Sequence, residues 1–194
     1  MKKVILSLAI LAGITGAAQA QSTRFGVKAG VGLSNITGDH TDGAKNLVGG
    51  QVGVMADLGF SDLISFHPEL LYSQKGVKYE GSGITGQTRT SYLDLPLLLR
   101  VNADGLFFEA GPQVGFLIGQ KTEINGTTIS TSTDGARKVD FGYIAGVGYQ
   151  LSSGLELGVR YNGGISDLSD PSTSGDKQRN SVFQFQVGYL FGGK

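Results

Sequence analysis

The stretch Tyr92–Arg100, which reads YLDLPLLLR, decides the fold because its two alternating faces need different surroundings. Side chains of a β-strand point alternately to the two faces of a sheet. Read as a strand, this stretch places four leucines on one face and, on the other, Tyr92, Asp94, Pro96, Leu98 and Arg100. Whether the leucines pack against a protein core or against lipid determines the class of protein.

The same alternation recurs along the chain after residue 20 and predicts eight strands. Helical periodicity is hard to find in this region. Most of the predicted strands reach the 9–11 residues that a tilted strand needs to cross a bilayer. The predicted strands are residues 24–34, 47–58, 63–75, 90–101, 106–119, 139–151, 155–162 and 181–191.

Short and long connections alternate between these strands. The short ones are Gly59–Asp62, Asn102–Gly105 and Ser152–Gly154, and the long ones are residues 35–46, 76–89, 120–138 and 163–180. Short turns at one rim and long loops at the other are typical of outer-membrane barrels. We therefore predict an all-β fold, an eight-stranded antiparallel transmembrane β-barrel with short periplasmic turns and long extracellular loops. Within the third long loop, Asn125-Gly126 and Asp134-Gly135 favour a hairpin.

The second face of the strands combines glycines with charged side chains. Glycine weakens a strand that faces water, but it fits beside larger polar groups in the narrow interior of an eight-stranded barrel. We therefore predict that lipid contacts the apolar face and that the polar face fills the lumen, so that the barrel is not an open pore. The predicted polar network of the lumen is Lys28, Glu69, Asp94, Arg100, Glu109, Asp140, Glu156 and Arg160. The alternative is a soluble periplasmic carrier of lipocalin type, with the apolar face inside.

Two details of the pairing follow from the turns and the prolines. The short connection Asn102–Gly105 predicts that Arg100 lies opposite Phe107 and diagonal to Glu109. Proline removes a hydrogen-bond donor from a strand, and a closed barrel has no edge to hide it. We therefore expect β-bulges at the prolines inside the predicted strands, which are Pro68, Pro96 and Pro112.

The N-terminus predicts export. It reads MKKVILSLAILAGITGAAQAQ, with two lysines, a short apolar segment and the small-residue site Ala18-Gln19-Ala20. This is the pattern of a secretory signal peptide. We expect cleavage after Ala20, which leaves one barrel domain of residues 21–194.

The chain has no cysteine and equal numbers of basic and acidic residues, 16 each. Disulfides and thiolate metal sites are excluded, and no basic excess points to nucleic acid.

One group of residues invites a catalytic interpretation. Ser65, His67 and Glu69 share one face of a predicted strand, as a serine nucleophile with its base and carboxylate would. Residues two apart along a strand are nearly 7 Å from each other, and the predicted face is turned away from lipid. An outer-membrane-embedded lipid hydrolase at these residues is the alternative. We predict a structural role in the lumen, no enzyme activity and no cofactor or metal site.

Several stretches resemble the PorT-like outer-membrane β-barrel family of Bacteroidota. They are FGVKAGVGLSNITG, HPELLYSQKGVKY, YLDLPLLLR, FFEAGPQVGFLIG and VFQFQVGYLF. The resemblance covers about residues 23–191. It implies an eight-stranded outer-membrane barrel from a member of the Bacteroidota. The namesake of the family assists protease secretion through the type IX system, and the family offers no catalytic residues to carry over. The tail Gly192–Lys194 departs from the pattern, because insertion signals usually end on the aromatic residue.

Together these observations predict a monomeric integral protein of the outer membrane, with both termini in the periplasm. Its expected partners are the lipid of that membrane and, during insertion, the barrel-assembly machinery. The exposed loops predict surface binding or an accessory role in secretion, through a surface or secretion-system partner. Nucleic acid is not an expected partner.

Overall fold

The computed structural model describes residues 23–39, 41, 43–81, 83–168 and 177–192. The predicted signal peptide, residues 1–20, lies outside these residues. The described chain forms nine strands, and no helix in it is long and apolar enough to cross a membrane. The strands are β1 (Thr23–Gly38), β2 (Ala44–Gly59), β3 (Ile64–Gly81), β4 (Ile84–Ala103), β5 (Leu106–Ile124), β6 (Thr127–Ser130), β7 (Val139–Gln150), β8 (Leu155–Gly164) and β9 (Gln178–Leu190).

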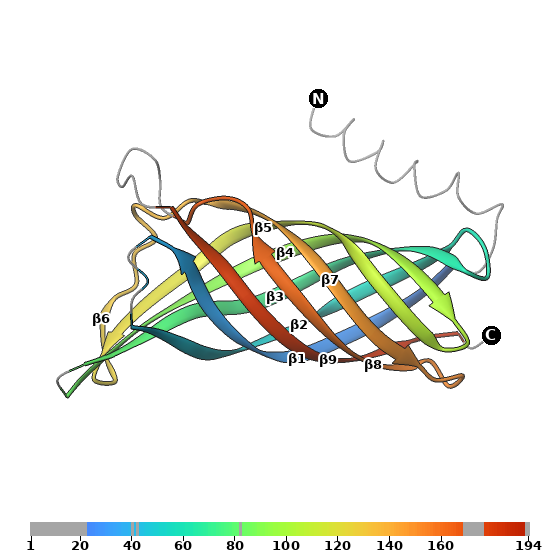
Figure 1. Ribbon diagram of the computed structural model, residues 1–194, viewed down its shortest axis with the longest axis horizontal. Helices are drawn as coiled ribbons and strands as arrows, with labels where there is room; N and C mark the ends of the chain where they lie inside the picture. Colours follow the sequence, from blue (N-terminus) through green and yellow to red (C-terminus); the bar gives the residue numbers. More distant parts are fainter. Residues whose placement is uncertain (1–22, 40, 42, 82, 169–176, 193–194) are drawn as a thin grey trace, which may run out of the picture.

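Eight of these strands close into a barrel (Figure 1). The order of neighbours is β4-β3-β2-β1-β9-β8-β7-β5, and a further pairing of β4 with β5 closes the ring. Every pair is antiparallel, including the pairing of β1 with β9 that joins the first strand to the last. The predicted eight-stranded antiparallel barrel is therefore confirmed. Among the described strands, the additional strand β6 pairs only with β5, at the edge of the sheet, and stands outside the ring.

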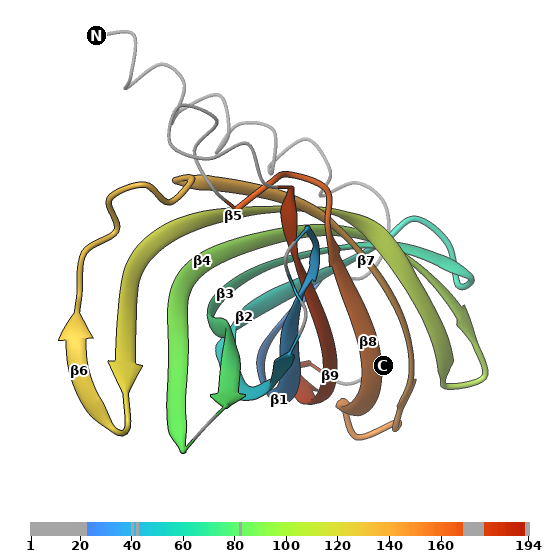
Figure 2. The same cartoon turned by 60° about the vertical axis from the view of Figure 1, so that its left-hand side comes forward.

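The two rims differ as predicted. The connections β2–β3, β4–β5 and β7–β8 are short and lie at one end of the barrel, on the right in Figure 1. At the other end, the strands β3, β4 and β5 continue well beyond the barrel wall (Figure 2). Residues 76–89, which were expected to be a loop, are instead paired almost to the tip of the β3–β4 hairpin. The predicted hairpin in the third loop is confirmed, with its turn at Asn125 and Gly126, where φ is 49° and 79°.

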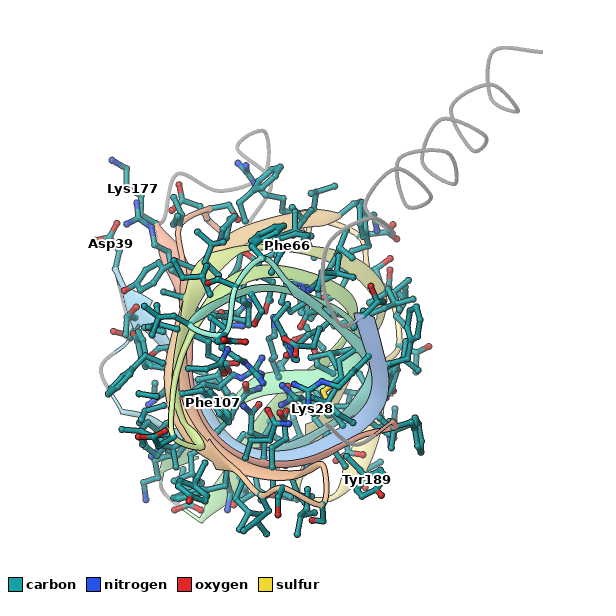
Figure 3. All side chains as sticks on the ribbon, turned by 90° about the vertical axis from the view of Figure 1, so that its right-hand side faces the viewer. Lys28, Asp39, Phe66, Phe107, Lys177 and Tyr189 are labelled. Carbon is teal, nitrogen blue, oxygen red and sulfur yellow. The ribbon has the colours of Figure 1, made fainter. Side chains whose placement is uncertain are left out.

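The two faces of β4 answer the question raised by Tyr92–Arg100. Leu99 is 58% exposed on the outside of the barrel, whereas Arg100 is 0% exposed in the lumen. Figure 3 looks along the barrel and shows Lys28 and Phe107 inside the ring, with Phe66 and Tyr189 outside it. Apolar side chains thus cover the outer surface and polar side chains fill the interior. The soluble-carrier alternative required the reverse arrangement and is wrong.

The predicted register between β4 and β5 is wrong by two residues. Arg100 lies directly opposite Glu109, and Ala103 lies opposite Leu106. The reason is the turn, which contains only Asp104 and Gly105, with φ of 48° and 90°. Two successive residues at positive φ match the twist of a hairpin in a two-residue turn, and Asp-Gly is a preferred pair for it.

The expected bulges at the prolines are not present. The register of β3 with β4 is the same on both sides of Pro68, and that of β5 with β7 runs unchanged through Pro112. Likewise, β4 keeps its register with β5 past Pro96. Pairing lapses for a few residues beside Pro68 and Pro96 instead, so that a missing donor interrupts the ladder without adding a residue. The bulges lie nearer the long-loop end, between Asn46 and Gln51, Ser91 and Tyr92, and Thr122 and Glu123.

Glycines make room for the large side chains in the lumen. A Cβ atom added to Gly146 would lie 3.0 Å from both Arg160 Cβ and Val159 O, and 3.2 Å from Glu109 Cγ. These are closer than ordinary van der Waals contacts. The alternation of glycine with charged residues, which the sequence already showed, therefore reflects the limited volume of the barrel interior.

Candidate functional site

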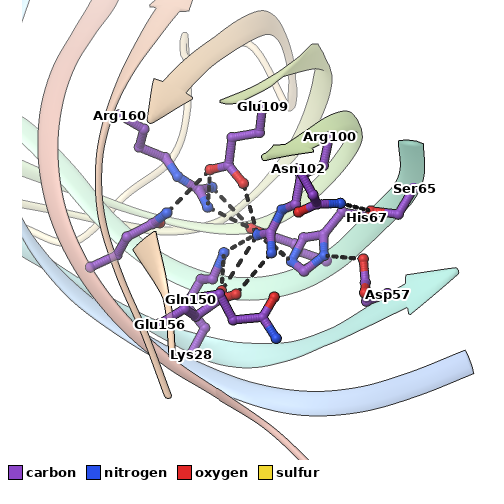
Figure 4. Close-up of polar contacts among 12 residues, drawn as sticks. Lys28, Asp57, Ser65, His67, Arg100, Asn102, Glu109, Gln150, Glu156 and Arg160 are labelled. Atoms are coloured by element: carbon purple, nitrogen blue, oxygen red, sulfur yellow. Dashed lines mark hydrogen bonds and ion pairs between the residues drawn. The ribbon is translucent and has the colours of Figure 1, made fainter. Parts of the chain in front are cut away.

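Six charged side chains meet at the centre of the lumen and form what we call the plug (Figure 4). They come from β1, β3, β4, β5 and β8, and all of them are buried. The plug consists of Lys28, Glu69, Arg100, Glu109, Glu156 and Arg160. Because each of these residues alternates with outward apolar neighbours, the strand pattern directs all six side chains into the lumen.

The two arginines organise the plug. Arg160 contacts both oxygens of Glu69 at 2.9 Å and reaches Glu109 at 3.1 Å. Arg100 donates to Glu156 at 2.8 Å and to Glu109 at 3.0 Å. The planar guanidinium presents five donors in a fixed geometry, so one arginine can bind two carboxylates at once. The Arg100 guanidinium also lies over the ring of Phe107, at 3.9 Å from its centroid.

Lys28 completes the charge balance. Its Nζ lies 2.5 Å from Glu69 Oε1 and 3.5 Å from Glu156 Oε1. The plug thus holds three cations and three carboxylates. Isolated charges are costly to bury, and this matched arrangement gives each of them an opposite partner within a hydrogen-bonded network.

Of the three residues in the hydrolase alternative, Glu69 is part of the plug, and Ser65 and His67 lie toward the short-turn end from it. His67 Nε2 lies 3.1 Å from Arg100 Nη2, so the imidazole accepts a hydrogen bond there, and Nδ1 faces Asp57 Oδ1 at 3.5 Å. The Ser65 hydroxyl accepts a hydrogen bond from Asn102 at 3.4 Å. Within the described residues, no hydrogen bond joins Ser65 to His67. All three side chains of the Ser65, His67 and Glu69 set are buried in the lumen.

His67, Glu69 and Glu109 also bring three potential metal ligands within 4.8 Å of one another. Both carboxylates, however, are already bound by Arg100, Arg160 or Lys28. A metal ion would add positive charge among three buried cations. The residues present therefore do not fit a metal site.

Two of the eight predicted network residues, Asp94 and Asp140, lie apart from the plug, nearer the long-loop end. Asp94 accepts a hydrogen bond from Ser73 at 2.5 Å and pairs with Lys75 at 3.0 Å. Asp140 accepts hydrogen bonds from Ser166 at 2.7 Å and Asn180 at 2.8 Å.

Four titratable residues belong to the lumen network but were not among the eight predicted ones: Arg24, Asp57, His67 and Lys75. Lys75 pairs with Asp94, His67 joins Arg100 to Asp57, and Arg24 pairs with Asp57 at 2.7 Å near the short-turn rim. The available signal was the alternation itself, because Lys75 and His67 share the lumen face with Glu69. Arg24 likewise occupies an even-numbered position on β1, on the same face as Lys28.

Above the plug, the long-loop end of the barrel contains a cavity of about 420 Å³, which we call the vestibule. Strands β1, β3, β4, β5 and β9 form its walls, and residues 134–136 and Leu168 also contribute. Its side chains are mostly uncharged but able to form hydrogen bonds, and among the described lining residues there is no lysine or arginine. The side chains of the lining that can form hydrogen bonds include Tyr79, Thr88, Thr90, Tyr92, Gln120 and Asn180.

A closed barrel with an apolar outer surface and a charge-balanced lumen defines an integral membrane β-barrel. The family comparison agrees with this class. A family model described as outer membrane protein beta-barrel domain matches residues 18–170, and the chain belongs to this family. The family and the fold assign the protein to the outer membrane.

Solved structures share the fold at low sequence identity. Neisserial surface protein A (NspA) superposes with a TM-score of 0.55 and 13% identity, covering 88% of this chain and 100% of that chain. Ail, the attachment invasion locus protein of Yersinia pestis, was solved in complex with the heparin analogue sucrose octasulfate. It gives a TM-score of 0.51 and 15% identity, with the same coverage of 88% and 100%. A comparison with curated protein sequences found no match.

Proposed function

We propose that this outer-membrane barrel is a closed, non-enzymatic and monomeric protein that binds a ligand at the cell surface, with the vestibule as its site. The observation that carries the proposal is the position of the vestibule directly above a filled lumen. Arg100 and Arg160 span the barrel between carboxylates of different strands, so a ligand that enters from the long-loop end meets the plug. The site is therefore a pocket with a floor and not the entrance to a channel.

The closed lumen has a direct electrical test. In planar bilayers, the reconstituted protein is expected to give no stable, large conductance. The double variant Arg100→Ala and Glu109→Ala removes one cation and one carboxylate, so the plug keeps its charge balance. A conductance that appears in this variant and not in the unmodified protein is the ion flow that the plug prevents. A stable large conductance of the unmodified protein would refute the closed-barrel proposal.

The lining of the vestibule favours an uncharged, hydroxyl-rich ligand such as a saccharide. Tyrosine rings offer an apolar face with a polar tip, and the amides of Gln120 and Asn180 supply both donors and acceptors. A volume of about 420 Å³ is within the usual range of small-ligand pockets. The absence of cations among the described lining residues distinguishes this site from one for a polysulfated ligand, such as the one named for Ail.

Binding can be measured with defined probes. Protein in lipid nanodiscs would be tested by saturation-transfer NMR against neutral mono- and disaccharides, with sucrose octasulfate as an anionic comparison. Tyr79→Ala and Gln120→Ala should each weaken binding of a neutral saccharide by about tenfold, the loss of one good contact of about 1.4 kcal/mol. Gln74→Ala, on the outer face of β3, is the matched control and should bind as the unmodified protein does. Failure of every neutral probe, or equal binding by all variants, would reject the proposed ligand class.

The absence of enzyme activity is part of the proposal. Its support is that Ser65 and His67 are enclosed in the lumen and that Arg100 already occupies Nε2 of the histidine. Cells that carry His67→Ala should therefore have the same lipid profile as cells with the unmodified protein, once equal amounts of folded barrel are verified. A lipid species that changes with this substitution would favour the hydrolase instead.

A second candidate is an accessory role in secretion, which the resemblance to the PorT-like family of Bacteroidota suggests. The observation that favours it is β6, which pairs with β5 on one side and lies at the edge of the sheet order. An exposed strand edge can bind an extended chain by adding a strand. Replacing Thr128 with proline should block such pairing, and reduced export of surface proteins in this variant would support the role. Normal export would argue against it.

A further inference from the structure

The outer face of the barrel carries four cations just beyond its apolar surface. Lys45, Lys78, Arg89 and Lys121 belong to four neighbouring strands, β2, β3, β4 and β5. Val77 and Tyr79 flank Lys78, and Thr88 and Thr90 flank Arg89; because these flanking residues line the vestibule, Lys78 and Arg89 point outward. Lys45 and Lys121 are their directly opposite partners on the neighbouring strands and therefore share this outer face. We call these four side chains the basic belt.

The register brings the members of the belt together. Lys45 lies directly opposite Lys78, and Arg89 lies directly opposite Lys121. Because Gly76 is the partner of Arg89 on β3, Lys78 is its diagonal neighbour. Like charges directly opposite each other destabilise a sheet. Two such pairs side by side therefore require an explanation other than the stability of the sheet.

Two carboxylates compensate only part of this charge. Glu80 lies 2.5 Å from both Lys45 and Lys78, and Glu123 lies 2.5 Å from Lys121. Among the described residues, these four cations and two carboxylates sum to a net charge of +2 on this face. The lysine side chains remain accessible, at 56% for Lys45 and 49% for Lys121.

The height of the belt matches the headgroup layer of a membrane. On the same strands, the outward positions closer to the barrel centre include Val48, Tyr72, Leu93 and Phe116, which are all exposed. Arg89 is two outward positions beyond Leu93, a distance of about 13 Å along the strand at about 3.3 Å per residue. Strand tilt shortens this height, and the headgroup region is several Å thick beyond the hydrocarbon core.

The opposite side of the barrel differs. There, the outward residues Asn35 and Ser181 face each other on β1 and β9 and are uncharged. The next pair outward is Thr37 and Arg179, and Asp167 compensates Arg179 at 3.4 Å. Within the described strand pairs, directly opposed cations therefore occur on the β2–β5 side and not between β1 and β9.

We propose that the basic belt binds the phosphate groups of anionic lipid headgroups in the outer leaflet. Arg89 donates a hydrogen bond from Nη1 to the Val48 carbonyl at 3.1 Å, and its remaining guanidinium donors are suited to bind phosphate oxygens, while the lysines contribute point charges beside it. Phosphate between the opposed cations removes the repulsion within each pair. This site is on the lipid-facing surface and is independent of the vestibule and its ligand.

The test uses nanodiscs of phosphatidylcholine with a minor fraction of anionic lipid, either phosphatidylglycerol or lipid A. Lipids retained by the protein are counted by native mass spectrometry after release from the disc. The unmodified protein should retain anionic over neutral lipid on the order of tenfold above the bulk ratio, given about two net charges at the headgroup layer. The variant with Lys45→Gln, Lys78→Gln, Arg89→Gln and Lys121→Gln should retain lipids at the bulk ratio.

The matched control neutralises four cations at the same end of the barrel but outside the belt: Arg137, Lys138, Lys177 and Arg179, each changed to Gln. It should retain anionic lipid as the unmodified protein does. Exposed charges contribute little to stability, so both variants should fold, and Lys45→Gln with Lys121→Gln is a milder substitute. Loss of enrichment in the control, unchanged enrichment in the belt variant, or competition by millimolar inorganic phosphate that abolishes lipid retention would each overturn the proposal.

Discussion

Arg100 and Glu109 lie directly opposite each other on β4 and β5, with Nη2 and Oε2 3.0 Å apart, and the same guanidinium reaches Glu156 on β8. β8 is not a neighbour of β4 in the ring, because β5 and β7 lie between them. One side chain thus joins an adjacent strand and a distant strand of the barrel. The Arg100 side chain therefore stabilises the β4–β5 pairing and at the same time fills the lumen.

Removing this cross-link should strongly destabilise the barrel. Arg100→Leu leaves Glu109 and Glu156 with one cationic partner fewer in a buried site, and we expect a loss of about 3–5 kcal/mol in the free energy of unfolding. Urea unfolding in detergent micelles measures this change. Arg179→Leu, which removes the exposed pair with Asp167, should cost at most about 1 kcal/mol. Equal effects of the two substitutions would show that the plug contributes no more than a surface ion pair.

The packing of the plug predicts that Gly146 cannot be enlarged without cost. In Gly146→Ala, the new methyl group would press against the stems of Arg160 and Glu109, and overpacking of this kind typically costs about 1–3 kcal/mol. Gly86→Ala is the control, because a Cβ there has nothing within 4 Å. The same urea unfolding experiment compares them. A Gly146→Ala variant as stable as Gly86→Ala would mean that the lumen has spare volume.

In the two-residue turn between β4 and β5, substitutions at Asp104 and at Gly105 are expected to differ in their effect on stability. Gly105→Ala places a side chain at φ of 90° and against Tyr149, and it should destabilise the hairpin by about 1 kcal/mol or more. Asp104→Asn keeps a residue that tolerates positive φ and should change stability by only a few tenths of a kcal/mol. Refolding into micelles and unfolding by urea give both values. If Asp104→Asn is the more harmful change, the backbone explanation is incorrect.

The hairpin beyond the barrel wall predicts a pH dependence at Glu80. Hydrogen bonds from Lys45 and Lys78 lower the pKa of Glu80 from 4.5 to about 2. Because the folded protein favours the charged carboxylate, this interaction stabilises the hairpin fully above pH 4.5 and is lost as the pH falls toward 2. Carboxyl-carbon NMR should find the low pKa, and Lys45→Ala with Lys78→Ala should return it toward 4.5. Lys121→Ala should leave it unchanged; a Glu80 pKa near 4.5 in the unmodified protein would contradict the prediction.

The strands and their two faces could be predicted because they depend on local alternation. Leu99 and Arg100 take opposite faces through the geometry of one strand, whatever surrounds them. The register was less predictable. Four turn residues were predicted between β4 and β5, whereas the structure has two, and the partner of Arg100 is therefore Glu109 and not Phe107. The β-bulges expected at the prolines are also not present, because a β-ladder can lose one hydrogen bond without the insertion of an extra residue.

The candidate site, too, could be predicted from the sequence only in part. Alternation was enough to direct Asp94 and Arg100 into one lumen, but not to show that they belong to different clusters. Their separation depends on strand tilt and on the stagger between strands that are far apart in sequence. The vestibule depends on how β1, β3, β4, β5 and β9 meet at the long-loop end, which no single segment specifies.

The sequence by itself determined the class of this protein, a membrane barrel with strands long enough to cross a bilayer, one apolar face and one polar face. Period-two patterning is a local property, and it fixes what each face must contact. Only the tertiary structure decided which polar groups pair, where the lumen closes, and how the basic belt gathers on one side. Those relationships join residues on different strands, and their distances follow from the register and closure of the whole barrel.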